Sequence, residues 1–340
     1  MKKILFLFVL SVTLGCASSK TSTQKTTSKI VLTQPEKAVE FAKIISATDL
    51  KDLLYIIASD DFEGRSTGEE GQKKAANFIK DFYIQLNIAS PYGGQDYFQN
   101  IPTEHLKAKI KPSENIVAFI EGSEKPEEII VISAHYDHLG TKNGEIYNGA
   151  DDDGSGTVAV MEIAKAFKNA SENGYQPKRS LLFLHVTGEE KGLLGSKYYT
   201  NFPIFPLEKT VTDLNIDMIG RVDTKHEENP NYVYLIGSDK LSKELHQLSE
   251  KVNEYYTQLE LDYTYNDENE PNRFYYRSDH YNFAKNNIPI IFYFNGTHAD
   301  YHKATDTPDK INYEILAKRA QLIFYTAWEI ANREKRIMAD

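Results

Sequence analysis

Apolar residues recur along this chain at two spacings, and each spacing predicts a kind of element. Intervals of three and four residues predict helices over 38–57, 72–86, 157–167, 241–256 and 313–332, with shorter helical stretches at 193–199 and 279–285. Short apolar runs predict strands, most of them buried in a central sheet, at 115–120, 129–133, 181–186, 214–216, 232–236 and 288–294. A weaker run at 259–263 predicts an edge strand.

The alternation of strands and helices after residue 115 predicts an α/β fold. We expect a three-layer sandwich in which helices flank a mixed, mostly parallel central sheet. Connections have the length of ordinary surface loops except 87–107, which predicts a hairpin or a longer excursion. No internal repeat and no second linker interrupt the pattern, so residues 36–340 are predicted to form a single domain.

The start of the chain has a different pattern. Two lysines precede a mostly apolar run over 4–14, which is too short to cross a bilayer as a helix but suits the core of a signal peptide. The run ends in Gly15-Cys16, which resembles the lipobox of bacterial lipoproteins. A general secretion signal with an incidental cysteine is the alternative.

We therefore expect a lipoprotein signal peptide at 1–15 and a lipid anchor at Cys16 as the contact with a membrane. Residues 16–35, rich in Ser, Thr and Lys, are expected to form a flexible tether. This reading places the protein in the cell envelope, at the periplasmic face or the outer membrane.

Composition narrows the chemistry of the predicted domain. Apolar residues make up 41% of the chain, which is enough for a sizeable core. Cys16 is the only cysteine, so the domain has neither a disulfide nor a thiolate nucleophile. The formal net charge is −10, and an acidic protein is a poor partner for nucleic acid.

Five loops near the predicted strand ends carry His or carboxylate groups. These groups are His135-Tyr136-Asp137-His138, the three aspartates within Asn148–Gly156, Glu189-Glu190, Asp217 and Tyr301-His302. In open α/β sheets, ligands gather at the carboxyl ends of the strands. Any one of these groups is typical of a solvated loop, but five of them at strand ends favour a shared site.

Imidazole and carboxylate ligands, with no cysteine in the domain, favour zinc. Two ions about 3.5–4 Å apart can share a carboxylate and a water, and a neighbouring carboxylate can then serve as general base. The chain contains no HExxH segment, which excludes a thermolysin-like site. Residues 64–68 fit G-x-S-x-G, but the polar residues before them do not form the strand that a nucleophile elbow requires, so Ser66 is not expected to be a nucleophile.

In chain order, five segments resemble peptidase family M28, the co-catalytic zinc aminopeptidases. They are HYD at 135–137, GADDDGSG at 149–156, TGEE at 187–190, NIDM at 215–218 and YH at 301–302. FEGRSTG at 62–68 and SDH at 278–280 are also similar to segments of that family, so the resemblance covers residues 50–325 in outline. It implies a zinc-peptidase sandwich of the phosphorylase/hydrolase-like type.

The resemblance also implies the ligands of two zinc ions per chain. His135 and Asp217 would bind one ion, Glu190 and His302 would bind the other, and Asp152 would bridge both. In this family the peptide bond after the bridging aspartate is commonly cis, so we expect a cis bond there. The two aspartates beside it would hold the loop.

Roles for further residues follow from the same resemblance. Glu189 would be the general base, and Asp137 would orient the ring of His135 through its other nitrogen. Tyr301 would hydrogen-bond the oxyanion, with simple packing beside the site as the alternative. His138 and His280 are expected to line the pocket rather than bind metal.

The function implied is a metallo-aminopeptidase that hydrolyses the N-terminal bond of peptides with a free N-terminus. Alternatives are a di-zinc carboxypeptidase or deacylase of the M20 type, a single-zinc glutaminyl cyclase, and a lipoprotein binding module with a degenerate site. The M20 type usually inserts a lid or dimerisation domain before its last histidine, whereas only 218–301 intervene here. A full set of five ligands and the base disfavours the other two.

Overall fold

The structure is a computed structural model that describes Met1 and residues 30–340. Within it, Leu32–Asp340 form a compact unit. The predicted signal peptide, the anchor at Cys16 and most of the predicted tether lie outside the described residues. Among the residues described, no helix combines the length and the apolar character that a membrane span requires.

An eight-stranded sheet forms the middle layer, in the order β1-β2-β6-β3-β7-β10-β8-β9. The strands are β1 (Phe98–Ile101), β2 (Ser113–Ile120), β3 (Lys125–His135), β6 (Arg179–Val186), β7 (Thr210–Ile216), β8 (Tyr232–Ile236), β9 (Glu260–Asp262) and β10 (Ile290–Phe294). The four central strands β6, β3, β7 and β10 are mutually parallel, and antiparallel pairs occur toward the edges. The prediction of a mixed, mostly parallel sheet is confirmed.

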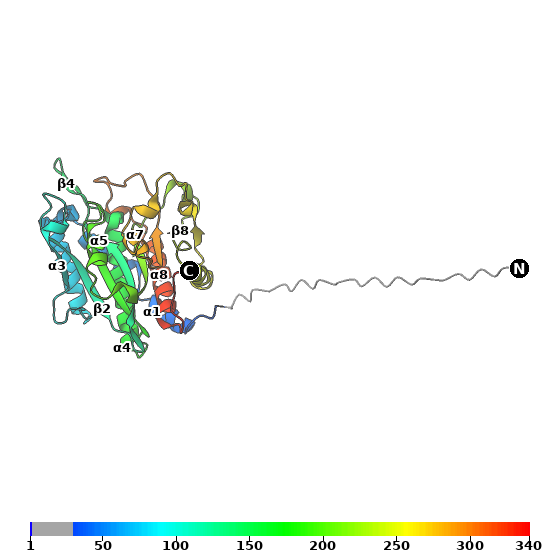
Figure 1. The fold of residues 1–340 in the computed structure, drawn as a ribbon. Coiled ribbons are helices and arrows are strands. Elements are labelled where there is room, and N and C mark those ends of the chain that lie inside the picture. The colour runs from blue at the N-terminus through cyan, green and yellow to red at the C-terminus, as the bar shows by residue number, and fades with distance from the viewer. Residues whose placement is uncertain (2–29) are drawn as a thin grey trace. The chain divides into compact units, whose positions relative to one another are not determined.

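Helices cover both faces of this sheet (Figure 1). They are α1 (Pro35–Ala42), α2 (Ala47–Ile57), α3 (Glu70–Gln85), α4 (Gly156–Glu172), α5 (Leu194–Asn201), α6 (Lys243–Tyr256), α7 (His280–Ala284) and α8 (Tyr313–Asn332). α4 and α8 pack on one face, with α1 and α2 against them, and α5 and α7 pack on the other. The expected three-layer sandwich is therefore present.

Burial on both faces explains the unbroken apolar runs of the central strands. In β6, Leu182 and Leu184 point toward α5 and α7, where they pack in one cluster with Tyr199 and Phe283. On the opposite face, the rings of Phe167 in α4 and Phe324 in α8 lie 4.7 Å apart. A strand covered on both sides has no polar face, so its sequence does not alternate.

Two hairpins occur at the surface. The excursion at 87–107 contains β1, which pairs with β2 as an antiparallel edge. The second hairpin, β4 (Gly140–Lys142) and β5 (Glu145–Tyr147), was not predicted. Asn143 and Gly144 join its strands with φ of 53° and 82°, a known hairpin signal. Three-residue polar strands carry too little apolar pattern to be recognised.

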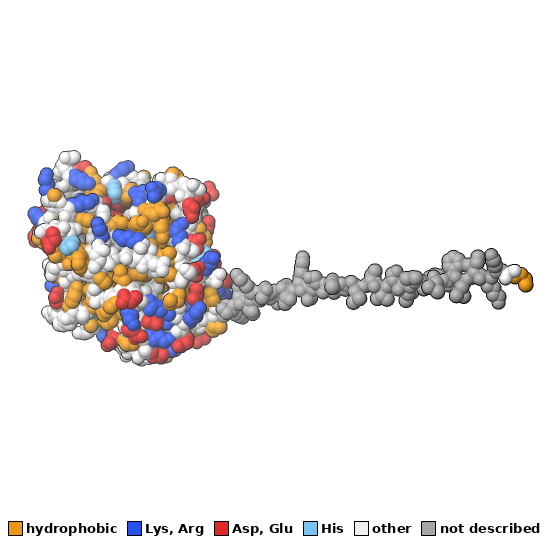
Figure 2. Space-filling view, in the orientation of Figure 1, with side chains coloured by type: hydrophobic (Ala, Val, Ile, Leu, Met, Phe, Trp, Pro, Cys, Tyr) orange, Lys and Arg blue, Asp and Glu red, His pale blue; other side chains and the backbone are white. Residues whose placement is uncertain are grey.

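Charged side chains of both signs are interspersed on the face turned toward the viewer in Figure 2. Basic groups on that face do not gather into one area. A stripe of basic side chains is the usual electrostatic footprint of nucleic-acid binding, and the face in view does not have one.

Candidate metal centre

The predicted metal ligands lie at the carboxyl ends of the parallel strands. His135 is the last residue of β3, Asp217 directly follows β7, and Glu190 follows β6. Asp152 lies in a tight turn that leads into α4, and His302 lies in the loop between β10 and α8. The topology of the sheet therefore brings five loops to one edge.

The two carboxylate oxygens of Asp152 face different histidines. Asp152 Oδ1 lies 3.3 Å from His135 Nε2, and Asp152 Oδ2 lies 3.0 Å from His302 Nε2. His135 Nε2 is also 3.6 Å from Asp217 Oδ1, and His302 Nε2 is 3.4 Å from Glu190 Oε1. Two groups of ligand atoms thus meet at one carboxylate, as two metals with a bridging ligand require.

Several atoms of this cluster are buried and make no hydrogen bond to any residue that the structure describes. They include His135 Nε2 and Glu190 Oε1, the latter close to His138 Nδ1 without hydrogen-bond geometry. Buried polar atoms normally have partners, and a cation between these atoms would supply one. Imidazole and carboxylate donors without thiolate are a zinc-type set, so the residues present fit the metal.

Electrostatics keep the acidic ligands ionised. Burial acts to raise the pKa of Asp152, but the imidazoles of His138, His135 and His302 hold it well below its ordinary value. Burial and Asp152 likewise act to raise the pKa of Glu190, while His138 and His302 lower it to about 2. Both side chains are therefore carboxylates at neutral pH, the form that binds metal.

Asp153 is a competing ligand, because its carboxylate lies within 4.8 Å of ligand atoms of His135 and Asp217. Asp153 Oδ1 already accepts two backbone N–H groups, at 2.9 Å and 3.0 Å. Burial raises the pKa of Asp153 well above its ordinary value, with His135 opposing the shift and Asp217 adding to it. Asp153 Oδ2, by contrast, is buried without a hydrogen-bond partner among the described residues, so Asp153 competes with Asp152 for the group that contains His135 and Asp217.

The ring of His135 is oriented by a backbone group. Its Nδ1 lies 3.1 Å from the carbonyl oxygen of Asp137 and 3.9 Å from Asp137 Oδ1. A carbonyl only accepts, so Nδ1 donates and Nε2 turns its lone pair toward Asp152. The carboxylate of Asp137, expected on the ring, instead accepts from the Thr67 hydroxyl at 2.7 Å and from the Glu189 N–H at 3.1 Å.

Asp151 and Asp153 hold the turn that presents Asp152. Asp151 Oδ1 accepts the Gly220 N–H at 2.7 Å, and Asp153 Oδ1 accepts the Met218 N–H at 3.0 Å, so both tie the turn to the residues after β7. A Cβ at Gly149, which has a φ of 53°, would lie 2.2 Å from the Asp152 carbonyl oxygen. The Asp152–Asp153 peptide bond is cis, as expected.

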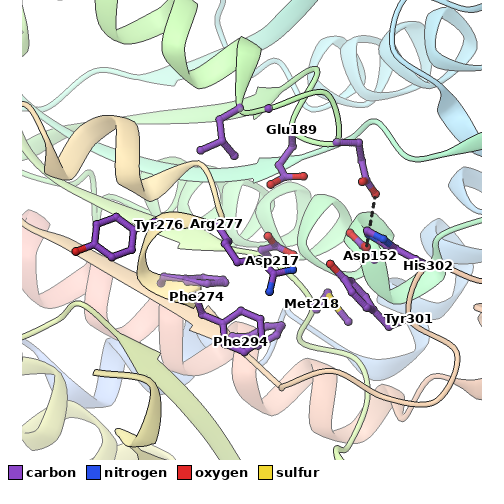
Figure 3. Close-up of a pocket in the computed structure, with 14 residues that line it drawn as sticks. Asp152, Glu189, Asp217, Met218, Phe274, Tyr276, Arg277, Phe294, Tyr301 and His302 are labelled. Atoms are coloured by element: carbon purple, nitrogen blue, oxygen red, sulfur yellow. Dashed lines mark ion pairs between the residues drawn. The ribbon is translucent and has the colours of Figure 1, made fainter. Parts of the chain in front are cut away.

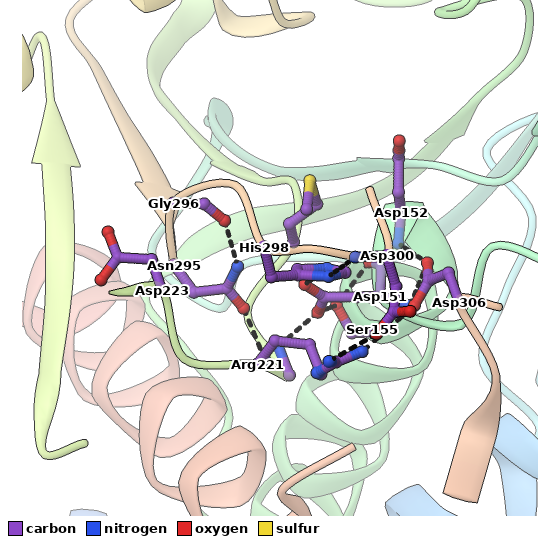
Figure 4. A network of polar contacts seen from close by, with 12 residues as sticks. Asp151, Asp152, Ser155, Arg221, Asp223, Asn295, Gly296, His298, Asp300 and Asp306 are labelled. Atoms are coloured by element: carbon purple, nitrogen blue, oxygen red, sulfur yellow. Dashed lines mark hydrogen bonds and ion pairs between the residues drawn. The ribbon is translucent and has the colours of Figure 1, made fainter. Parts of the chain in front are cut away.

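Two residues that support this turn were missed in the sequence. Asp306 Oδ2 accepts the N–H groups of Asp151 and Asp152 at 3.0 Å and 3.2 Å, and His298 Nε2 lies 3.1 Å from Asp151 Oδ2 (Figure 4). Their position on either side of Tyr301-His302 was the available signal. Their contacts link the loop after β10 to the turn before α4.

Arg65 connects the metal loops to the helices near the start of the unit. Its guanidinium is fully buried and donates to the carbonyl oxygens of Ile57 (3.0 Å), Tyr136 (2.8 Å), Asn148 (2.6 Å) and Gly149 (2.9 Å). Burial lowers the pKa of Arg65 to about 10, which still leaves it charged at neutral pH. The FEGRSTG segment therefore contributes a structural clamp.

Glu189 lines the same cavity as Asp152 and Asp217. Burial raises the pKa of Glu189 well above its ordinary value; His135 opposes the shift, and the carboxylates of Asp217, Asp279 and Glu190 add to it. The group has no metal ligand role in the geometry above. It is free to exchange a proton with a molecule in the cavity.

His138 and His280 do not line the cavity, contrary to expectation. Both are fully buried behind its wall. His138 Nδ1 lies 2.9 Å from Glu190 Oε1, and its ligand atom lies within 4.8 Å of those of Asp152 and Glu190, so His138 is a competing ligand at this position. The ring of His280 stacks on Phe292 at 4.6 Å, and its Nε2 contacts the Tyr275 carbonyl oxygen at 2.8 Å.

The cavity has a volume of about 410 Å³, within the usual range for small-molecule sites. One side carries the carboxylates and His302, and the other carries apolar side chains (Figure 3). The apolar residues of the lining are Leu193, Met218, Phe274, Phe292 and Phe294. Tyr301 lies between the two sides, with its ring 3.9 Å from that of His302.

Comparison with known proteins agrees with this geometry. The chain matches the model of peptidase family M28 over residues 115–327. It is 26% identical to leupeptin-inactivating enzyme 1 of Streptomyces exfoliatus over 306 residues, which cover 82% of this chain and 59% of that protein. The chain thus spans little more than half the length of this curated relative.

Two solved structures share the fold. The LapA aminopeptidase of Legionella pneumophila has a TM-score of 0.69 at 22% identity, over 90% of this chain and 78% of that one. The glutaminyl cyclase of Bacteroides thetaiotaomicron has a TM-score of 0.63 at 17% identity, over 86% of this chain and 99% of that one. Both activities thus occur on this architecture, so residues of the site must decide between them.

Proposed function

The chain belongs to peptidase family M28, and from that premise we propose that it is a zinc-dependent aminopeptidase. It hydrolyses the N-terminal peptide bond of peptides with a free N-terminus. The observation that carries the proposal is the position of Asp152, whose two oxygens face His135 and His302 beside Glu189. A single-zinc enzyme does not need a carboxylate with two such faces.

The proposed mechanism assigns each side chain one task. His135 and Asp217 would hold one zinc, Glu190 and His302 would hold the other, and Asp152 would contribute to both. Zinc bound there would polarise the scissile carbonyl and lower the pKa of water. Glu189 removes the proton from the attacking water and delivers it to the leaving amine.

Tyr301 lines the cavity beside His302 and supplies a hydrogen-bond donor there. Burial, together with Asp152 and Asp217, raises the pKa of Tyr301, so its hydroxyl remains protonated. A protonated hydroxyl can stabilise the oxygen that gains charge in the transition state.

The test is a panel of aminoacyl and dipeptidyl fluorogenic substrates with N-blocked controls, combined with metal analysis. We expect cleavage that requires the free amine, loss of activity with a chelator, and two zinc equivalents per chain. Cleavage from the C-terminus would support the M20-type alternative. One equivalent with cyclisation of N-terminal glutamine would replace the proposal with a glutaminyl cyclase.

We also propose that the protein is a lipoprotein of the cell envelope, anchored through Cys16. The support is the sequence pattern alone: a short apolar run after two lysines that ends in Gly15-Cys16. We expect fatty-acid labelling and detergent partitioning of the full chain, both lost in Cys16→Ala. Equal partitioning of the two proteins would refute the anchor.

A further inference from the structure

The cavity that holds the carboxylates also contains a guanidinium. Among the residues that the structure describes, Arg277 is the only Lys or Arg that lines it. In Figure 3 its side chain extends from the stretch that carries Phe274 and Tyr276 toward Asp217. Its guanidinium carbon lies 4.9 Å from the centre of the Phe274 ring, and it forms no hydrogen bond or ion pair with a described residue.

Stacking on Phe274 leaves the hydrogen-bond donors of Arg277 available. A guanidinium contacts an aromatic ring with its flat face, while its N–H groups point outward along the edge. Those N–H groups form a fork that matches the two oxygens of a carboxylate. The ring therefore orients a cation whose donors remain free for a ligand.

The backbone at Arg277 is anchored on both sides. Before it, the Arg277 N–H donates to the Phe274 carbonyl oxygen at 3.0 Å. After it, Ser278 and Asp279 are buried, with Ser278 Oγ accepting from Asn215 at 2.9 Å and Asp279 bonded to the Ser196 hydroxyl. Because the backbone of Arg277 is fixed, the guanidinium samples fewer positions, which reduces the entropy lost when a ligand binds.

Arg277 shares its cavity with the groups assigned to the reaction. Glu189, Asp217 and Tyr301 line the same cavity as the guanidinium. A substrate bound in this cavity would lie within reach of Arg277 and of these groups.

We propose that Arg277 binds a carboxylate of the substrate, so that short peptides with an anion close to the scissile bond are preferred. This inference rests on the proposed aminopeptidase activity. The anion has two possible sources: the free C-terminus of a dipeptide, one residue beyond the scissile bond, or an acidic side chain of the first residue. The apolar side of the cavity, with Met218 and Phe294, favours the first source because it suits an apolar side chain.

Two substrate pairs and their N-acetylated controls test the inference. Leu-Gly and its C-terminal amide differ only in the terminal carboxylate, Leu and Glu aminomethylcoumarin amides differ in the side chain, and N-acetylated versions of each control for the free amine. Arg277→Gln removes the guanidinium. Arg273→Gln is the matched control, because Arg273 is an exposed arginine of the same stretch, stacked on Tyr276 at 4.7 Å and lining a different cavity.

We expect the wild type to favour Leu-Gly over its amide in kcat/KM by roughly tenfold to a hundredfold, the range of one charge-assisted contact. In Arg277→Gln this ratio should fall toward one, mainly because KM for Leu-Gly rises. In Arg273→Gln the ratio should stay at the wild-type value. Because Arg277 is exposed, raising the ionic strength from about 0.05 M to about 0.5 M should reduce the wild-type ratio. A preference for Glu over Leu, lost in the same variant, would assign the acidic side chain instead.

Two results would overturn the inference while leaving the aminopeptidase activity intact. One is equal kcat/KM for the free and amidated dipeptides, with no preference for Glu, in the wild type. The other is a fall in kcat/KM in Arg277→Gln that is the same for every substrate, because a residue with only a structural role would give that pattern. Absence of cleavage of any unblocked substrate would instead refute the proposed function itself.

Discussion

At the scale of single residues, carboxylates that are neighbours in the sequence make different contacts in the site. Asp152 turns both oxygens to histidines, whereas the next residue, Asp153, has one oxygen occupied by the backbone. Glu190 lies beside His138 and His302, and its neighbour Glu189 opens into the cavity. Adjacent residues of the same type therefore have different surroundings, which supports the different tasks that we propose for them.

Glu189→Gln tests the proton transfer. The amide keeps the size of the side chain but cannot accept the water's proton, so kcat should fall by roughly a factor of 10²–10⁴. Zinc content should remain at the wild-type level, because the five ligands are unchanged. Glu208→Gln, at an exposed position, is the control for the loss of one carboxylate. Turnover equal to that of the wild type would remove Glu189 from the mechanism.

At the scale of elements, the metal loops depend on contacts that run between them. Arg65 joins the end of α2 to the loops on either side of the β4–β5 hairpin through four carbonyl oxygens. Asp306 joins the loop before α8 to the turn before α4. The sheet positions the ends of the strands, and these polar side chains then fix the loops relative to one another.

Arg65→Lys tests the clamp. Lysine carries the same charge but cannot reach four carbonyl oxygens in different directions, so buried acceptors would lose their partners at a cost of about 1–3 kcal/mol each. We expect the free energy of unfolding in urea to fall by at least about 3 kcal/mol. Arg273→Lys, at an exposed site, should change it by less than about 0.5 kcal/mol. An equally small change in both variants would show that Arg65 does not hold the loops.

The elements could be read from the sequence because each carries a local signal, and the predicted metal ligands came from the resemblance to a family. The unbroken run at 181–186 required a strand buried on both faces, and His135 or Asp217 directly follows such a run. Arg65 could not be found in this way, because its partners are backbone carbonyl oxygens, which have no sequence signature. The position of Arg277 in the cavity likewise depends on how a loop folds, and no periodicity encodes that.

At the scale of the whole unit, the two ends of the described chain are joined at α8. Glu329 accepts the Thr33 N–H at 2.8 Å and the Tyr256 hydroxyl at 3.2 Å, and Trp328 Nε1 donates to the Thr33 carbonyl oxygen at 2.9 Å. Burial raises the pKa of Glu329 to about 7, although Thr33 and Tyr256 oppose the shift. A buried acid with a raised pKa makes stability depend on pH.

The sign of this dependence follows from the raised pKa. The folded chain holds the proton of Glu329 more tightly than the unfolded chain, so the stabilising contribution is complete below pH about 4.5 and is lost as the pH rises through about 7. Glu329→Gln can accept the Thr33 N–H through its one oxygen and donate to the Tyr256 oxygen through its amide group, and it does not ionise. Its stability relative to the wild type should therefore increase between pH 5 and pH 8 by about 2 kcal/mol.

Urea unfolding at several pH values measures this difference, with the exposed Glu254→Gln as control. A wild-type-minus-variant difference that does not change with pH would show that Glu329 has no raised pKa in the folded chain. Because the residue is remote from the metal ligands in the sequence and lies on the far end of α8, the effect should be the same with and without a chelator.

The two edge strands of the sheet affect whether separate molecules can associate through strand pairing. β1 has four residues and β9 has three, so an eight-stranded sheet ends on each side in a strand that offers few free backbone groups. Long exposed edge strands are templates on which another chain can add, and shortening them is a common protection against aggregation. Pairing of edge strands between molecules is most frequent where proteins lie close together at high local density. In this chain, the two shortest strands of the sheet form its two edges, which limits such pairing.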